Sequence, residues 1–179
     1  MFEFSKKGSN ATYNAETKTL TFIYPDFIDG GTMLHELIHY YQDMSGYYPD
    51  MASMGRDKDT RVTSKGFANL EFETMLIDNI RTGIPDNYLN QLKESKLLPV
   101  AELAKIRDEY NDFLKSFKDS QGKLRDIAQM DKPKLLSDYS KFLDLYATKS
   151  KDYRSEIFAD MEPKALLDLL KYINEHCKN

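Results

Sequence analysis

The segment His35-Glu36-Leu37-Ile38-His39 contains the residues of this chain that are best suited to do chemistry. The chain has only three histidines, and two of them stand four positions apart, with a glutamate directly after the first. In an α-helix, four residues advance a side chain by about 400° and about 6 Å, so both imidazoles project from one face. Two imidazole nitrogens at this separation can converge on one Zn2+ ion, each at about 2.0–2.1 Å. The spacing therefore predicts one zinc ion bound to a helix.

Glu36 follows His35 directly, which places it about 100° further around the helix axis. At that angle its carboxylate flanks the ion and can accept a proton from a water molecule that the metal polarises. We therefore expect Glu36 to be the general base of a hydrolytic reaction. One alternative is a chance match, for which histidine is too rare in this chain. The other is a structural or vestigial zinc site without catalysis, which the same ligands would form.

A catalytic zinc ion needs a third protein ligand and an open position for water. The remaining histidine, His176, belongs to the segment NEHCKN and would have to fold back onto the site. Carboxylates on a second expected helix, from about Ser64 to Arg81, are better candidates. There Glu71 shares a side with Asp78, whereas Glu73 lies about 200° away from Glu71. A carboxylate on the buried side of this helix would need a partner, such as a metal ion. Either glutamate could face inward, so periodicity leaves both Glu71 and Glu73 open as the third ligand.

Two short strands and a helix are expected to position the histidine pair. Residues 11–24 predict two strands around a turn near Asn14–Glu16, because the second strand is rich in β-branched and aromatic residues. The metal-binding helix is expected to begin near Gly31 or Thr32 and to end at Gly46, a position typical of a C-terminal cap. Its apolar positions follow the spacing of a buried helical face: Leu34, Leu37, Ile38 and Tyr41.

After a loop at residues 45–63 and the helix that carries the two glutamates, the remaining chain is expected to be helical. Pro99 stands in the first turn of a long amphipathic helix, and further helices are expected over residues 135–146 and 165–173. The apolar stripe of the long helix comprises Val100, Leu103, Ile106, Tyr110, Phe113 and Phe117. The expected fold class is α+β, predominantly α overall. Residues 1–85 would form the metal-binding core, and residues 86–179 a helical region packed on it as one compact unit.

The charge distribution argues against nucleic acid as a partner. The net charge is −4; residues 1–90 carry 8 Lys/Arg against 13 Asp/Glu, and residues 91–179 carry 17 against 16. Neither half is a basic field, so duplex nucleic acid is not an expected partner. The basic residues of segment 56–65 are the only feature that favours DNA, and Asp57 and Asp59 offset them. A membrane partner is not expected either, since no run approaches the about 20 apolar residues of a membrane helix.

Cysteine content and the first residues indicate the compartment. Cys177 is the only cysteine, so neither an internal disulfide nor a cysteine-based zinc site is expected. The segment MFEFSKKGSN lacks the apolar stretch of a signal peptide. A cytoplasmic location is therefore the default expectation, and a secreted protein whose signal has been removed would present the same sequence.

The segments HELIHYYQ and NLEFETMLI together resemble the zincin metallopeptidases, and among them the gluzincins. Gluzincins take their third ligand from a glutamate on a helix after H-E-x-x-H, and the resemblance implies Glu71 in this role, although Thr74 and Met75 depart from the usual pattern. It extends over about residues 10–82. It implies a zincin-like minimal metallopeptidase core, with a small β layer and two active-site helices, followed by an all-helical C-terminal region. It also implies that the strand Thr19–Tyr24 presents an edge to an extended peptide.

Other residues are candidates for supporting roles. Asp78 and Asp43 are candidates to orient His35 or His39 through an N–H···O hydrogen bond. In the loop after the metal-binding helix, a tyrosine hydroxyl or an arginine guanidinium could stabilise the negative charge of a transition state. The candidates by position are Tyr47, Tyr48, Arg56 and Arg61.

The sequence thus favours a zinc-dependent metallopeptidase that hydrolyses a peptide or protein substrate with a metal-polarised water activated by Glu36. The alternative from a different class is a non-catalytic or regulatory helical binding protein that retains a structural or vestigial zinc site. The large helical share of the chain motivates this alternative.

Overall fold

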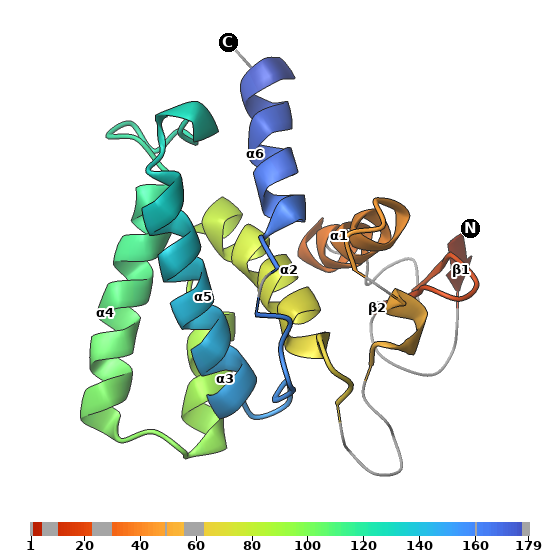
Figure 1. Ribbon diagram of the computed structural model, residues 1–179, viewed down its shortest axis with the longest axis horizontal. Helices are drawn as coiled ribbons and strands as arrows, with labels where there is room; N and C mark the ends of the chain where they lie inside the picture. The colour runs from red at the N-terminus through yellow and green to blue at the C-terminus, as the bar shows by residue number, and fades with distance from the viewer. Residues whose placement is uncertain are drawn as a thin grey trace. The chain divides into compact units, whose positions relative to one another are not determined.

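The computed structural model describes residues 2–4, 11–22, 30–48, 50–55, 63–159 and 161–176 (Figure 1). The chain divides into two compact units, Met1–Gly55 and Arg56–Asn179. The described residues are predominantly helical, and the named strands among them form one small sheet in the first unit. A small sheet combined with many helices is the composition that the sequence predicts.

The boundary between the two units falls before the boundary expected at residues 85 and 86. The difference lies in α2 (Phe67–Thr82), which carries both candidate glutamates and belongs to the second unit. This helix packs on α5 (Lys132–Lys149) and also contacts α3 (Asp86–Ser95). Most of its residues are buried, so α2 forms part of the core of the helical unit.

The first unit contains a three-stranded sheet and a helix. Its strands are β1 (Phe2–Phe4), β2 (Ala11–Asn14) and β3 (Thr19–Phe22), in the spatial order β1-β3-β2. β1 is parallel to β3, and β2 is antiparallel to it, with Tyr13 opposite Leu20. The turn predicted after Asn14 is confirmed: the Asn14 carboxamide oxygen accepts hydrogen bonds from the backbone N–H of Glu16 and Thr17, at 2.9 and 3.0 Å. This local cap favours the tight reversal between the strands.

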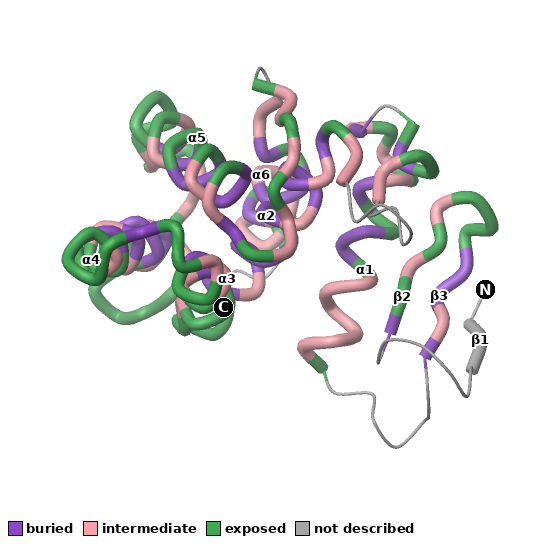
Figure 2. The backbone as a smooth tube through the Cα atoms, turned by 90° about the horizontal axis from the view of Figure 1, so that it is seen from below, coloured by how far each residue is buried: buried purple, intermediate pink, exposed green. Residues whose placement is uncertain are grey.

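The order of the strands corrects one expectation. The strand from Thr19 was expected to present a free edge to a peptide, but β3 is the central strand and is paired on both sides. The edge beside α1 (Gly30–Met44) belongs to β2, as Figure 2 shows. Residues 23 and 24 lie outside the described residues. β2, and not β3, is therefore the edge strand on that side of the sheet.

The helix that was predicted to carry the histidine pair is confirmed, with a different buried face. α1 ends at Met44 and is followed by Gly46, whose φ of 65° and N–H···O bond to Asp43 at 3.0 Å provide the expected cap. The expectation that Leu37 and Tyr41 are buried was wrong, because they are 37% and 42% exposed. The buried residues of α1 are Ile38, His39 and Gln42. Two of these three are polar, so apolar spacing alone could not identify this face.

The second unit is built around aromatic side chains. Besides α2, α3 and α5, it contains α4 (Val100–Ser116), α6 (Lys164–His176) and the short 3-10 helix η3 (Ile127–Gln129). The first unit also contains a short 3-10 helix, η2 (Met51–Ser53), within the loop predicted at residues 45–63. Exposed residues follow the outer sides of α3 and α4 in Figure 2, and buried residues follow their inner sides. The large, fully buried rings of the core are Tyr88, Tyr110, Tyr146, Phe72, Phe117 and Phe142.

The buried tyrosines of this core have hydrogen-bonding partners. The Tyr88 and Tyr110 rings stack with centroids 4.1 Å apart. The Tyr88 hydroxyl donates to the Phe142 carbonyl at 3.2 Å, and the Asn79 amide donates to the Tyr110 oxygen at 3.0 Å. Burial raises the pKa of both tyrosines well above the ordinary value. Each ring therefore contributes apolar area while its hydroxyl stays neutral and satisfied.

The start of α2 is fixed by the segment between α5 and α6. Gly66 has a φ of 83°, and its N–H donates to the Glu156 carbonyl at 2.8 Å. The Asn69 side chain both accepts from the Phe158 N–H, at 3.0 Å, and donates to the Phe158 carbonyl, at 3.1 Å. A Cβ on Gly66 would overlap the Phe158 ring. Glycine is thus required at this position by both backbone conformation and space.

The apolar stripe predicted for α4 begins later than expected. Val100 is 85% exposed, whereas Ile106, Tyr110 and Phe113 are buried. Pro99 precedes the helix as its N-terminal cap. The buried part of the stripe therefore begins after the first turn of α4.

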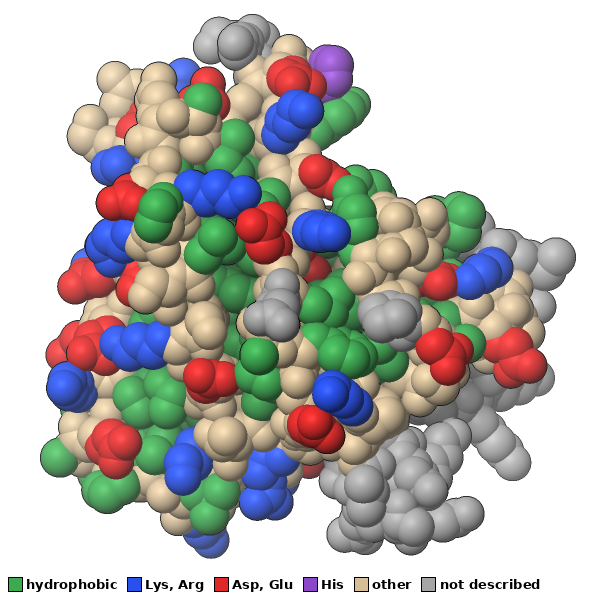
Figure 3. Space-filling view, viewed as in Figure 1, with side chains coloured by type: hydrophobic (Ala, Val, Ile, Leu, Met, Phe, Trp, Pro, Cys, Tyr) green, Lys and Arg blue, Asp and Glu red, His purple; other side chains and the backbone are tan. Residues whose placement is uncertain are grey.

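Charged side chains of both signs alternate over the face of the helical unit that Figure 3 shows. Exposed ion pairs such as Lys141–Glu109, at 2.9 Å, and Lys151–Glu94, at 2.7 Å, link neighbouring elements. Such pairs contribute about 0–1 kcal/mol each. Among the described helices, none has the length and apolar character needed to cross a membrane.

We expect Gly66→Ala to lower the free energy of unfolding by more than Gly122→Ala does. Both glycines have positive φ, but a Cβ on Gly122 would meet nothing within 4 Å. The control should lose about 1–2 kcal/mol for the backbone conformation. Gly66→Ala should lose about 1–3 kcal/mol more, because the Phe158 ring must move. Urea denaturation followed by circular dichroism measures both losses, and equal losses would contradict the role given to Phe158.

Candidate metal centre

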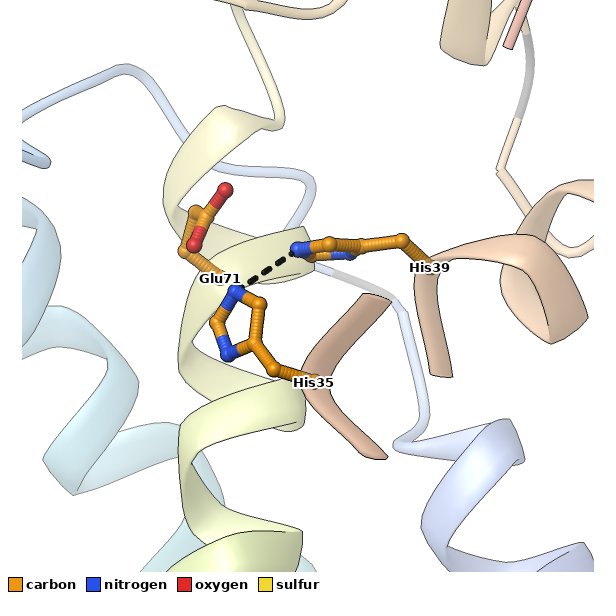
Figure 4. A group of neighbouring side chains, drawn as sticks. All are labelled: His35, His39 and Glu71. Carbon is orange, nitrogen blue, oxygen red and sulfur yellow. Dashed lines mark hydrogen bonds between the residues drawn. The ribbon is translucent and has the colours of Figure 1, made fainter. Parts of the chain in front are cut away.

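His35 and His39 lie on consecutive turns of α1 and direct their rings toward each other (Figure 4). The two Nε2 atoms are 3.1 Å apart, and the ring centroids are 4.7 Å apart with an angle of 86° between the planes. His39 is buried, with 6% of its surface exposed, and His35 is half-buried. The sequence spacing therefore produces the nitrogen pair that it predicts.

The separation of the two nitrogens fits a shared metal ion. In a tetrahedral zinc site with Zn–N distances of about 2.0–2.1 Å, two nitrogen ligands lie about 3.3 Å apart. The 3.1 Å between the Nε2 atoms differs from this by only a few tenths of an ångström. Between two neutral imidazoles the same distance corresponds to one N–H···N hydrogen bond, with one ring as donor and one as acceptor. Two nitrogens already directed at each other need little rearrangement to bind one ion.

Gln42 fixes the orientation of His39. The Nδ1 atom of His39 lies 2.9 Å from the Gln42 carboxamide oxygen, and Gln42 is completely buried. Since a carboxamide oxygen only accepts, this contact assigns the proton to Nδ1 and leaves the Nε2 lone pair available for a metal. A neutral histidine held in this tautomer is the usual form of a metal-binding imidazole.

The sequence reasoning missed Gln42. The signal that could have identified it is its position three residues after His39, on the histidine face of the helix. A long polar side chain on the buried face of a helix needs a partner, and His39 is a polar group within its reach.

A group of three described side chains could hold a metal ion: His35, His39 and Glu71. Each offers one ligand atom, and these atoms all lie within 4.8 Å of one another. Figure 4 shows the two imidazoles of α1 and the Glu71 carboxylate of α2. Two nitrogens and one carboxylate oxygen are a donor set that zinc commonly takes, and three protein ligands leave one tetrahedral position for water. The residues present therefore fit a zinc ion.

Glu73 lies in a different environment from Glu71. Its carboxylate is fully buried and accepts a hydrogen bond from the Leu166 N–H at 3.1 Å. Leu166 is in the first turn of α6, where backbone N–H groups have no partner within the helix and favour negative charge. Burial, followed by the charge of Glu73, raises the pKa of Tyr139 well above its ordinary value. Glu73 thus serves the packing of α6.

Glu36 is bound to the edge strand of the sheet. Its Oε2 atom accepts a hydrogen bond from the backbone N–H of Tyr13 at 2.6 Å. The carboxylate is half-buried and lies one position after His35 on α1. A general base must be able to reach its proton, so this contact bears directly on how Glu36 would work.

The two aspartates expected to orient the histidines have other partners. Asp43 accepts a short hydrogen bond from the Tyr13 hydroxyl and pairs with Lys18 at 2.5 Å. Burial, and then the Asp43 carboxylate, raises the pKa of Tyr13 far above its ordinary value. Asp78 pairs with Arg81 at 2.6 Å. The Nδ1–H of His39 is donated to the Gln42 carboxamide oxygen.

The remaining candidates lie as follows. Tyr48 is buried, and Tyr47 is half-buried with its ring 6.3 Å from that of Tyr41. Their role at a transition state stays a prediction. His176 is exposed at the end of α6, with its ring 4.4 Å from that of Tyr172. Two candidates lie outside the described residues: Arg56 and Arg61.

Comparisons with known proteins do not add to this picture. No family model matches the chain, and neither a curated protein nor a solved structure does. The assignment of a function therefore depends on the geometry and the chemistry of the site.

We expect Gln42→Leu to weaken zinc binding by about 10–100-fold, the usual effect of losing a partner of a metal-binding histidine. Leucine has a similar volume, so the helix should stay folded while Nδ1 of His39 loses its acceptor. Competition with a chromogenic chelator measures the affinity. Asp43→Asn is the matched control, and it should leave the affinity within about 2-fold because its partners are Tyr13 and Lys18. A loss in Asp43→Asn without a loss in Gln42→Leu would show that Asp43 orients the histidines.

Proposed function

We propose that this protein is a zinc-dependent metallopeptidase of the gluzincin type. The observation that carries the proposal is the pair of Nε2 atoms 3.1 Å apart on α1, in the ligand group that also contains Glu71. The proposed core consists of the small sheet, α1 with the H-E-x-x-H motif, and α2 with the third ligand. The zincin-like fold is part of this proposal.

The proposed ligands are neutral imidazole nitrogens of His35 and His39 and one carboxylate oxygen of Glu71. Gln42 keeps the His39 ring in the tautomer that presents Nε2. A bound zinc ion would lower the pKa of a water molecule and polarise the carbonyl group of a substrate. Two neutral ligands and one anionic ligand leave a net positive charge at such a centre, which favours attack by water at neutral pH.

Glu36 is the proposed general base. It accepts the proton that water loses as its oxygen attacks the peptide carbonyl carbon, and it then donates this proton to the nitrogen of the departing amine. The attack forms a C–O bond, and the subsequent cleavage of the C–N bond releases a carboxylic acid and an amine. The position of Glu36 beside His35 places the carboxylate next to the ligands without making it one of them.

The proposed substrate is a peptide or protein that binds in an extended conformation. Support comes from β2, an edge strand next to α1 whose Tyr13 N–H points away from β3 and toward Glu36. Neither nucleic acid nor a membrane is part of the proposal. The alternation of charge on the helical unit offers no support for a polyanionic partner (Figure 3).

A second candidate function is a regulatory binding protein with a structural or vestigial zinc site. The contact between Glu36 and the Tyr13 N–H favours it, because the proposed base is already engaged. So does the exposed apolar side of α1, formed by Leu37, Tyr41 and Met44. The two functions differ in whether Glu36 is needed for chemistry.

Glu71→Gln and Glu73→Gln form a matched pair for the third ligand, since each removes only a charge. Glu71→Gln should reduce the zinc content well below the about one ion per chain expected of the wild type, because a carboxamide is a poor zinc ligand. Glu73→Gln should keep the metal, because its oxygen can still accept from Leu166. Elemental analysis of the purified proteins measures the zinc content. The reverse pattern would identify Glu73 as the ligand.

Glu36→Gln should lower the hydrolysis of fluorescently labelled casein by about 10²–10⁴-fold, since the carboxamide cannot accept the proton from water. Its zinc content should stay near that of the wild type, because Glu36 is not a ligand. Full activity in Glu36→Gln would exclude Glu36 as the base.

The structural alternative makes a different prediction for the same proteins. With a structural ion, the wild type would show no hydrolysis, and EDTA would cause a large loss of folded stability. With a catalytic ion, EDTA should abolish hydrolysis and have a smaller effect on the unfolding transition.

A further inference from the structure

The edge strand β2 holds Glu36 through a backbone group that a substrate would also use. In an antiparallel pair, alternate residues direct their N–H and C=O groups toward the neighbouring strand, and the others direct them outward. Tyr13 is opposite Leu20 in β3, but its N–H donates outward to Glu36 at 2.6 Å. The outer edge of β2 is therefore occupied, at Tyr13, by the carboxylate of the proposed base.

The side chain of Tyr13 is attached to α1 independently of this amide contact. Its hydroxyl donates to Asp43, and its ring lies edge-on to that of Tyr40, with centroids 5.7 Å apart. Lys18, at the other end of the hairpin turn, pairs with Asp43 as well. Glu36, Tyr40 and Asp43 are spaced by four and three residues, so all three lie on one face of α1. The strand would thus stay in place if the Tyr13 N–H changed its partner.

We propose that an extended peptide displaces Glu36 from the Tyr13 N–H and so frees the base only when substrate is bound. This inference rests on the proposed function and adds a regulatory step to it. A peptide that pairs with the outer edge of β2 needs the Tyr13 N–H as a donor for one of its own carbonyl groups. One N–H cannot make a full hydrogen bond to both acceptors, so pairing of the peptide releases the Glu36 carboxylate.

The arrangement has a consequence for selectivity. Without an extended segment on β2, the Oε2 atom of Glu36 remains hydrogen-bonded to the Tyr13 N–H, so this oxygen is engaged by the strand and not by a water molecule. A peptide long enough to pair with β2 both positions its scissile bond and activates the base. Short peptides that do not pair with β2 are consequently poor substrates, even when they can reach the metal.

The Tyr13 amide itself reports on this exchange of partners. With the zinc-loaded, 15N-tyrosine-labelled chain, NMR measures hydrogen exchange at the Tyr13 N–H in the wild type, in Glu36→Ala and in Asp43→Asn. Exchange should accelerate by at least about 10-fold in Glu36→Ala, because the acceptor is lost. It should change by less than about 2-fold in Asp43→Asn, which keeps an acceptor for the Tyr13 hydroxyl. Equal exchange in the wild type and Glu36→Ala overturns the proposal.

A second measurement tests the release by a peptide. Oxidised insulin B chain is added to zinc-loaded Glu36→Gln, which keeps an oxygen acceptor but should not cleave the peptide. The Tyr13 amide resonance should shift on titration, and in Glu36→Ala the peptide should restore slow exchange. An unchanged Tyr13 amide at saturating peptide overturns the displacement step. Hydrolysis by the wild type is scored separately with casein, so a failure of the proposed function is distinguished from a failure of this inference.

Discussion

The placement of two imidazole rings on consecutive turns of one helix is the constraint on which the proposed site depends. Helical geometry alone brings the side chains of His35 and His39 to one face, and their nitrogens meet at 3.1 Å. Gln42, three residues further along that face, removes the remaining freedom of the His39 ring. Three residues within two turns of α1 thus define the direction from which an ion would bind.

The carboxylates near the site are subject to a second constraint. When a carboxylate is buried, it must lie near a positive charge or near hydrogen-bond donors. Glu73 meets it at the first turn of α6, and Asp43 meets it with Lys18 and the Tyr13 hydroxyl. Glu36 meets it with the Tyr13 N–H. Glu71 is the carboxylate in the ligand group with the two histidines.

Local patterns in the sequence were sufficient for the elements that depend on neighbouring residues. The helix over residues 30–44, its cap at Gly46 and the turn after Asn14 all follow from contacts within a few positions. The approach of the two histidine rings follows from their spacing in the same way. These features could be predicted because no distant part of the chain decides them.

The features that sequence reasoning missed depend on partners far away in the chain. Glu73 finds its donor 93 positions later, in Leu166. β3 becomes the central strand because β1, only three residues long, pairs with it in parallel, so the free edge passes to β2. Leu37 and Tyr41 have the spacing of a buried face, but α1 meets the hairpin through Glu36, Tyr40 and Asp43 instead. The spacing of apolar residues identifies one face of a helix, but it does not predict which other element packs against that face.

The central claim is that His35, His39 and a carboxylate bind one zinc ion. X-ray absorption at the zinc edge, on protein loaded with one equivalent of zinc, tests it most directly. The account predicts two imidazole nitrogens and oxygen ligands, all at about 2.0–2.2 Å, in four-coordinate geometry. In a His35→Ala, His39→Ala double variant that keeps the wild-type circular dichroism spectrum, this signal should disappear. An ion surrounded by water oxygens alone, or the same spectrum in the double variant, would contradict the account.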